Sequence, residues 1–138
     1  MKKYLLFVLA ISPILAFSQT VNGSFYGGKP SITQITIISR GDDRLGLGDD
    51  FKREFAMRGV DVFAQTKIGQ NTEINSETVN SKYAMTFSYV VNGYGMLYKT
   101  NVDIIDIEND GKVIGNFTYS GMKGRKKVVP KFVDTILK

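Results

Sequence analysis

The sequence predicts an α+β fold: a two-layer sandwich in which a mixed sheet, with an antiparallel three-strand meander, carries two helices on one face. Apolar residues alternate with period two in successive stretches of the C-terminal half. Helical spacing of apolar residues occurs twice, near the middle and at the end of the chain. The order strand, helix, strand, polar connection, meander, helix is typical of a sheet covered on one side.

A strand, a helix and a second strand form the first part of this pattern. Residues 32–38 are rich in β-branched side chains and end before a turn-forming Gly-Asp-Asp, which favours a strand. Residues 49–59 combine an acidic start, apolar residues four apart, a basic last turn and a final glycine, and so predict a helix. We expect Asp49 and Asp50 to cap it. Residues 60–63 alternate as a brief strand.

The polar connection and the meander follow. Residues 64–81 are polar, and they form either one helical turn around residues 75–80 or a long loop. Residues 83–89 alternate as a strand, and the following Asn92-Gly93 is a strong hairpin signal. The chain returns through residues 96–107, with a local disturbance at Ile104-Ile105.

A second turn and a terminal helix complete the fold. Asp110-Gly111 supplies the positive φ that a tight turn needs, and residues 113–119 then alternate as the third strand of the meander. In residues 129–137 the apolar positions follow i, i+3, i+4, i+7 and i+8, which predicts a packing helix with Pro130 in its first turn.

The N-terminus predicts export. Lys2 and Lys3 precede an apolar run, and Ala16-Phe17-Ser18 places small residues at the positions of a cleavage site before Gln19. The run is shorter than the roughly 20 residues of a membrane span. We therefore expect a signal peptide at residues 1–18, a glycine-rich arm at 19–31, and a single domain at 32–138 that is periplasmic or secreted. Residues 21–30 of the arm could be a loose segment or an edge strand, and we favour a partly ordered arm.

The net charge argues against nucleic acid as a partner. The chain has 18 basic and 13 acidic residues, and removing residues 1–18 takes away two lysines and no acid. The net charge then falls from +5 to +3, far from the strong basic stripe of a nucleic-acid binder.

The sequence contains no cysteine and no histidine. Without cysteine the chain has no disulfide, no thiolate catalysis and no lipid attachment of the kind that tethers bacterial lipoproteins. Without histidine it has no imidazole catalysis. An enzyme would have to work through carboxylates, Lys, Tyr or Ser alone. We expect no catalytic activity, no cofactor, no metal site and no stable membrane anchor.

Three partial motifs have simpler interpretations. Residues 23–30 match the start of a phosphate-binding loop, but Pro30 stands where a Ser or Thr is needed. Asp106, Glu108 and Asp110 resemble the front half of a calcium loop, but the position of the bidentate Glu is Phe117, so we expect a hairpin turn. The Ser-x-x-Lys of residues 120–123 lacks the companion motifs of serine enzymes.

One basic cluster is the candidate binding site. A solvated helix entrance explains it, and the functional alternative is an anionic partner such as a phosphorylated lipid head group, an acidic glycan or an acidic protein surface. The cluster consists of Lys123, Arg125, Lys126, Lys127 and Lys131.

The succession of elements, above all the strand-turn-strand of residues 102–114 with its Asp-Gly-Lys turn, resembles an α/β domain of envelope proteins. The family includes the amino-terminal part of TolB, the curli secretion protein CsgG and outer-membrane activators of penicillin-binding proteins. The resemblance covers about residues 32–138. It implies a non-enzymatic module that acts through protein-protein contacts in the bacterial envelope. The alternative function is a binder of a small ligand or an anionic envelope polymer through residues 123–131. Partner identity and oligomeric state stay open.

Overall fold

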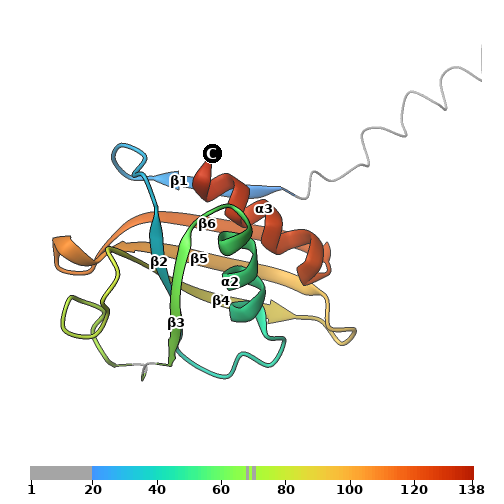
Figure 1. Ribbon diagram of the computed structural model, residues 1–138. Coiled ribbons are helices and arrows are strands. Elements are labelled where there is room, and N and C mark those ends of the chain that lie inside the picture. The colour runs from blue at the N-terminus through green and yellow to red at the C-terminus, as the bar shows by residue number, and fades with distance from the viewer. Residues whose placement is uncertain (1–19, 68, 70) are drawn as a thin grey trace, which may run out of the picture.

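Six strands form one mixed sheet, and two helices lie on one of its faces (Figure 1). The computed structural model describes residues 20–67, 69 and 71–138, so the predicted signal peptide lies outside the described residues. The strand order is β1-β6-β5-β4-β2-β3, in which β2 is parallel to both neighbours and every other pair is antiparallel. The predicted α+β class, with its meander of β4, β5 and β6, is confirmed. The strands are β1 (Val21–Phe25), β2 (Gln34–Ser39), β3 (Asp61–Lys67), β4 (Tyr83–Val91), β5 (Leu97–Asp106) and β6 (Lys112–Lys123), and the helices are α2 (Leu47–Met57) and α3 (Arg125–Leu137).

The glycine-rich segment that we expected to be a partly ordered arm contains the edge strand β1. The strand pairs antiparallel with β6, and Val21 and Phe25 pack against the core. Gly23 allows this close pairing, because a Cβ there would overlap the carbonyl oxygen of Asn116. Phe25 lies over Gly115, its partner on β6. The glycines therefore serve strand contact, so the edge strand, the less favoured of the two interpretations, is the correct one.

Helix α2 begins two residues before the predicted start, and its cap is a different residue. The carboxylate of Asp43 accepts hydrogen bonds from the backbone N–H groups of Leu47, at 2.8 Å, and Gly48, at 2.7 Å. Gly46 occupies the N-cap position and has no side chain that could accept these hydrogen bonds. Asp49 and Asp50 lie inside the first turn, so the prediction that they cap the helix is wrong. A capping side chain must come from before the first turn, where it can reach the free N–H groups.

Helix α3 begins four residues before the predicted start, at Arg125. Pro130 consequently lies in the second turn, not the first, which corrects the prediction. Because proline has no N–H, the carbonyl of Lys126 lacks its usual helical donor. The helix tolerates this because its apolar side chains are buried in the core: Val128, Val129, Phe132, Val133 and Ile136.

The meander has the two predicted turns. Between β4 and β5 the positive φ belongs to Gly95, and the Asn92 side chain accepts hydrogen bonds from the N–H groups of Tyr94 and Met96. Between β5 and β6, a 3-10 turn at Ile107–Asn109 leads into Asp110 and Gly111, both with positive φ as predicted. The predicted disturbance at Ile104-Ile105 is a register shift against β6.

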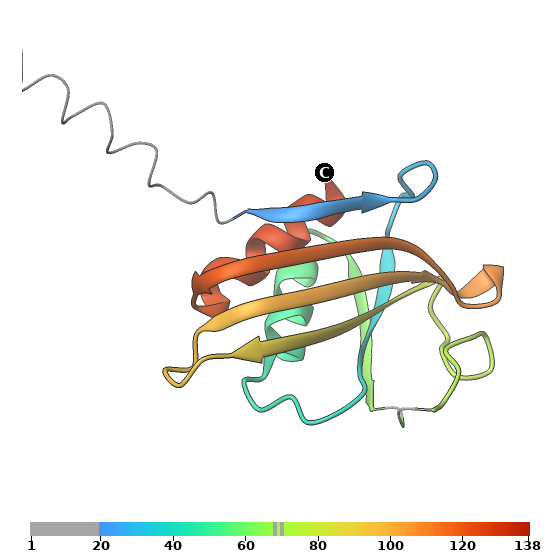
Figure 2. The same ribbon diagram turned by 180° about the vertical axis from the view of Figure 1, so that it is seen from behind.

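The core lies mainly between the sheet and the two helices, and Figure 2 shows the strands from the side that the helices leave uncovered. A smaller apolar cluster lies on that other face, under residues 71–82. This part of the polar connection forms one turn, in which the N–H of Val79 donates to the carbonyl of Asn75 at 2.9 Å. The cluster comprises Ile38, Ile74, Val79, Ala84, Ile105 and Ile107.

Candidate anion-binding site

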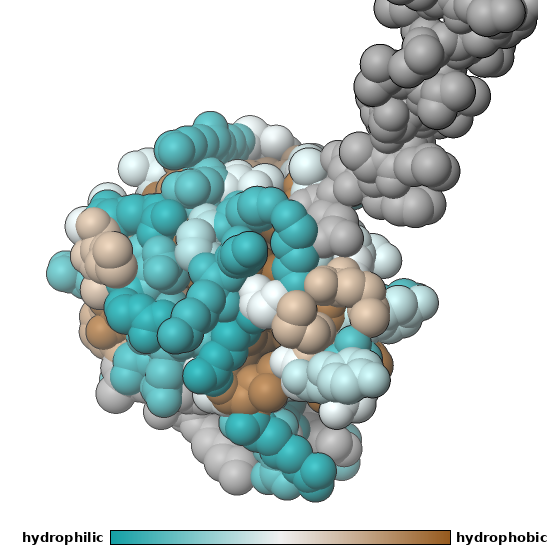
Figure 3. Space-filling view, turned by 90° about the vertical axis from the view of Figure 1, so that its right-hand side faces the viewer, coloured by the Kyte–Doolittle hydropathy of each residue, from teal (hydrophilic) through white to brown (hydrophobic). Residues whose placement is uncertain are grey.

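A hollow of about 760 Å³ lies at one end of the molecule, where the loop before α2, the β4–β5 hairpin and the junction of β6 with α3 meet. Figure 3 views this end, where hydrophilic residues surround small brown, apolar areas. We name this hollow the basic pocket. It is lined by Arg44, Leu45, Gly95, Met96, Met122, Lys123, Gly124, Arg125, Lys126 and Lys127.

Four of the five predicted cations line the basic pocket. They come together because β6 ends at Lys123 and α3 starts at Arg125. The chain turns at Gly124, and the basic residues on both sides of this turn line the pocket. Lys131 does not line the pocket and lies exposed farther along α3. The pocket has one further cation, Arg44, which the sequence did not predict. Only the fold brings it beside residues about eighty positions later, and no local pattern signals this.

Arg125 is held against the pocket wall by a buried carboxylate. Its Nε lies 3.3 Å from Oδ2 of Asp50, whose Oδ1 accepts a hydrogen bond from Arg53 at 3.0 Å. Asp50 is 6% exposed, and a buried carboxylate needs such cationic partners. Asp50 therefore helps to fix the start of α3 against α2.

The other cations of the pocket have no carboxylate partner among the described residues. Within the part of the chain that the structure describes, no carboxylate lies within ion-pairing distance of Arg44, Lys123, Lys126 or Lys127. Gathered around one hollow, these side chains produce a positive potential that attracts anions.

The loop that carries Arg44 is anchored to the sheet. The hydroxyl of Tyr89 donates to Oδ1 of Asp43 at 2.7 Å and accepts from the N–H of Leu45 at 3.1 Å. Burial is the main cause of a raised pKa of Tyr89, so this hydroxyl stays a protonated donor at neutral pH. Arg44 lies between the two anchored residues, which limits how far its backbone can move.

The partial motifs lie elsewhere or serve the fold. Gly23 contacts β6, and Asp106, Glu108 and Asp110 lie at the β5–β6 turn. Ser120 is on the exposed side of β6, while Lys123 of the same Ser-x-x-Lys pattern lines the pocket. In the described part of the chain, no helix has the length and apolar character to cross a membrane.

Comparisons with known proteins identify the class of fold. No protein-family model and no curated protein matches the chain. Among solved structures, the fold is similar to that of PelC from Paraburkholderia phytofirmans, described as a dodecamer, at 12% identity and a TM-score of 0.51. The alignment covers 87% of this chain and 93% of that one. At this identity, the likeness shows a shared α+β fold.

Two further structures align less well. A variant PelC dodecamer from the same organism has 13% identity, a TM-score of 0.47, and coverage of 87% of this chain and 92% of its own. TolB from Acinetobacter baumannii has 11% identity, a TM-score of 0.45, and coverage of 86% of this chain and 29% of its own. TolB was named in the resemblance drawn from the sequence. The resemblance to CsgG and to the activators of penicillin-binding proteins stays a prediction.

Proposed function

We propose that this chain is an exported, non-enzymatic binding module that recognises an anionic group at the basic pocket. One observation carries the proposal: Arg44 joins Lys123, Lys126 and Lys127 of the basic run around one hollow, and none of the four has a carboxylate partner in the described chain. Uncompensated cations repel one another, so their convergence costs stability that an anion would restore.

The carboxylates beside the pocket support binding over catalysis. Asp50 is committed to two arginines, and Asp43 accepts from two backbone N–H groups and the Tyr89 hydroxyl. Neither is free to act as a general acid or base. An apolar lining from Leu45, Met96 and Met122 suits the non-polar part of a ligand.

The test replaces Lys126→Gln and Lys127→Gln together. We expect this variant to bind inorganic polyphosphate, a polyanionic probe, roughly tenfold more weakly, because two attractive charges are lost. Isothermal titration calorimetry at low and high salt measures the change, and binding should weaken as salt screens the charges. Arg125 is left in place, since removing it would strand the buried Asp50.

The matched control is Lys29→Gln with Lys112→Gln, which removes the same charge. Lys112 begins β6, at the end away from the pocket, and Lys29 follows β1, whose last residue Phe25 pairs with Gly115 near that end. We expect this control to bind the probe as the parent chain does. Equal loss in both variants would mean that only net charge matters, and the pocket would then have no special role.

A contact with another envelope protein is the second candidate function, and a sheet edge favours it. Strand β3 pairs with β2 alone among the described strands, so its other side offers free backbone donors and acceptors to an incoming strand. The similar PelC structure is described as a dodecamer, which shows that this fold can form an assembly in that protein.

Crosslinking in intact cells tests this second candidate. A photoreactive residue at Phe63, on β3 and 38% exposed, should capture a specific envelope protein or a second copy of the chain. The same group at Val113, on β6 and 37% exposed, is the control for random capture. Identical products from both positions, or none from Phe63, would count against the edge contact.

A further inference from the structure

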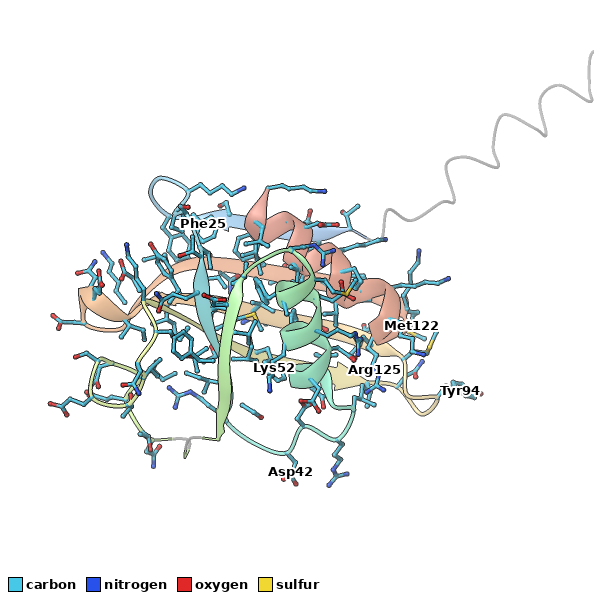
Figure 4. The ribbon with its side chains drawn as sticks, viewed as in Figure 1. Phe25, Asp42, Lys52, Tyr94, Met122 and Arg125 are labelled. Atoms are coloured by element: carbon cyan, nitrogen blue, oxygen red, sulfur yellow. The ribbon has the colours of Figure 1, made fainter. Side chains whose placement is uncertain are left out.

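Exposed apolar side chains gather around the mouth of the basic pocket. Tyr94, at the tip of the β4–β5 hairpin, is 92% exposed, and Met122, near the end of β6, is 50% exposed. Figure 4 labels both residues at the same end of the molecule as Arg125. Of nine large, exposed hydrophobic residues in the described chain, five belong to this hairpin and to β6 beside it. We name these five the apolar rim: Val90, Val91, Tyr94, Tyr98 and Met122.

The fold places the apolar rim directly beside the cations. Leu97, where β5 begins, pairs with Lys123 on β6. The side-chain amide of Asn92 lies 3.7 Å from the sulfur of Met122, which joins the hairpin to β6. The Nζ of Lys99 lies 5.8 Å from the centroid of the Tyr98 ring. The β4–β5 hairpin, which carries most of the apolar rim, thus lies beside the end of β6, where Met122 and Lys123 follow one another.

The hairpin tip is a built structure. The Asn92 side chain accepts hydrogen bonds from the N–H groups of Tyr94, at 2.9 Å, and Met96, at 3.0 Å. Gly95 adopts a positive φ of 75° to close the loop. An ordered turn thus holds the Tyr94 ring outward in water. This exposure of an apolar ring does not stabilise the isolated chain.

We propose that this end of the molecule docks on an anionic lipid surface. Tyr94 and Met122 enter the headgroup region, while Lys123, Lys126 and Lys127 contact lipid phosphates. A tyrosine suits this position because its ring is apolar and its hydroxyl is polar. Basic residues near an anionic bilayer each add attraction that salt screens.

The apolar rim separates this partner from a soluble anion. A soluble anion would use the cations and leave Tyr94 in water, whereas a bilayer takes up both kinds of side chain at once. Contact of this kind is peripheral and reversible, and it needs no spanning helix. The inference rests on the proposed function, because it uses the same cations and names the source of the anionic group.

Vesicle sedimentation tests the docking. The full chain, in its exported and processed form, should bind vesicles of phosphatidylglycerol and phosphatidylethanolamine, and should not bind phosphatidylcholine vesicles. Tyr94→Ser with Met122→Ser should weaken binding about tenfold, from the loss of buried apolar area. Lys126→Gln with Lys127→Gln should weaken it roughly 30-fold. All variants share one N-terminus, so differences between them report this end of the molecule.

A matched control uses the same chemistry elsewhere. Tyr26 is 69% exposed and Met57 is 71% exposed, and neither belongs to the apolar rim. Tyr26→Ser with Met57→Ser should bind the anionic vesicles as the parent chain does. If this control loses as much binding as the rim variant, the docking site is wrong.

Fluorescence gives a second measurement, because the chain contains no tryptophan. A Tyr94→Trp variant carries one tryptophan, whose emission should shift to shorter wavelength with anionic vesicles as the ring enters the headgroup region. In a Tyr26→Trp variant the emission should stay unchanged. No shift at position 94 would overturn the inference.

Inorganic polyphosphate distinguishes the two proposals. Binding of polyphosphate without binding of anionic vesicles would leave the anion-binding function standing and overturn the membrane contact. Equal binding of both vesicle types would also overturn it, because the lipid charge would then be irrelevant. If the chain binds neither polyphosphate nor anionic vesicles, both proposals are overturned.

Discussion

Gly111 shows what one residue decides in this fold. It has a φ of 69°, and a Cβ at this position would overlap the carbonyl oxygen of Ile74. The β5–β6 turn thus contacts the backbone of the 71–82 segment and holds it over the smaller apolar cluster. Gly95 has a similar φ of 75° but nothing within 4 Å of its Cβ position. The two glycines differ in surroundings and agree in backbone conformation.

Alanine substitutions at these two glycines should therefore differ in cost. Gly95→Ala should lower the free energy of unfolding by about 1 kcal/mol through backbone strain alone. Gly111→Ala should lower it by roughly 2–4 kcal/mol, because steric overlap adds to the strain. Urea unfolding followed by circular dichroism measures both. Equal losses would mean that the contact with Ile74 contributes nothing.

The two helices illustrate the scale of elements, since one ion-pair network joins them. Arg58, just after α2, donates from Nε to Oδ1 of Asp134 on α3 at 2.9 Å and from Nη1 to Oε2 of Glu54 at 2.7 Å. The hydrogen bond from Arg58 is the main cause of a lowered pKa of Asp134. The Asp134 side chain is 41% exposed, so the pair contributes less than about 1 kcal/mol.

This network predicts a pH dependence with a definite sign. A carboxyl whose folded pKa lies below its ordinary value of 3.8 stabilises the fold above that value, and the contribution is lost as pH falls through the folded pKa. Asp134→Asn should be less stable than the parent chain at neutral pH, and the difference should shrink as the pH falls below 3.8. Urea unfolding at about pH 7 and about pH 3 gives the comparison.

An exposed carboxylate outside any ion pair of the described chain, Asp42, supplies the control for this measurement. Asp42→Asn should track the parent chain at both pH values. A difference between Asp134→Asn and the parent chain that stays constant with pH would contradict the assignment, since it would then come from packing and not from charge.

At the scale of the whole molecule, local patterns predicted the elements, and contacts distant in sequence decided the rest. Period-two alternation identified β4, β5 and β6, because one face of each is buried. Strand β1 was only the less favoured alternative, because edge pairing through Gly23 leaves no alternating pattern of large residues. The predicted start of helix α3 was four residues too late, because the basic residues of its first turn line the pocket and show no apolar periodicity.

The candidate site was predictable only in part for the same reason. Lys123, Arg125, Lys126 and Lys127 are near neighbours in sequence, and the charge run identified them. Arg44, the carboxylate of Asp50 and the apolar rim join them through tertiary structure. Lys131 belongs to the run and not to the pocket, because the helix carries it away from the junction.

The pairing of β1 with β6 joins two segments from opposite ends of the described chain. Val21 lies opposite Tyr119. Strand β1 is therefore synthesised early but can pair only after β6, near the end of the chain, has been synthesised. Closing so long a loop is entropically costly, and contacts so distant in sequence form slowly. Until β1 arrives, the outer edge of β6 is an unprotected strand edge, open to mispairing with other chains. We therefore expect the N-terminal strand to join the sheet late and, on pairing, to cover the edge of β6 through which the nascent molecule could aggregate.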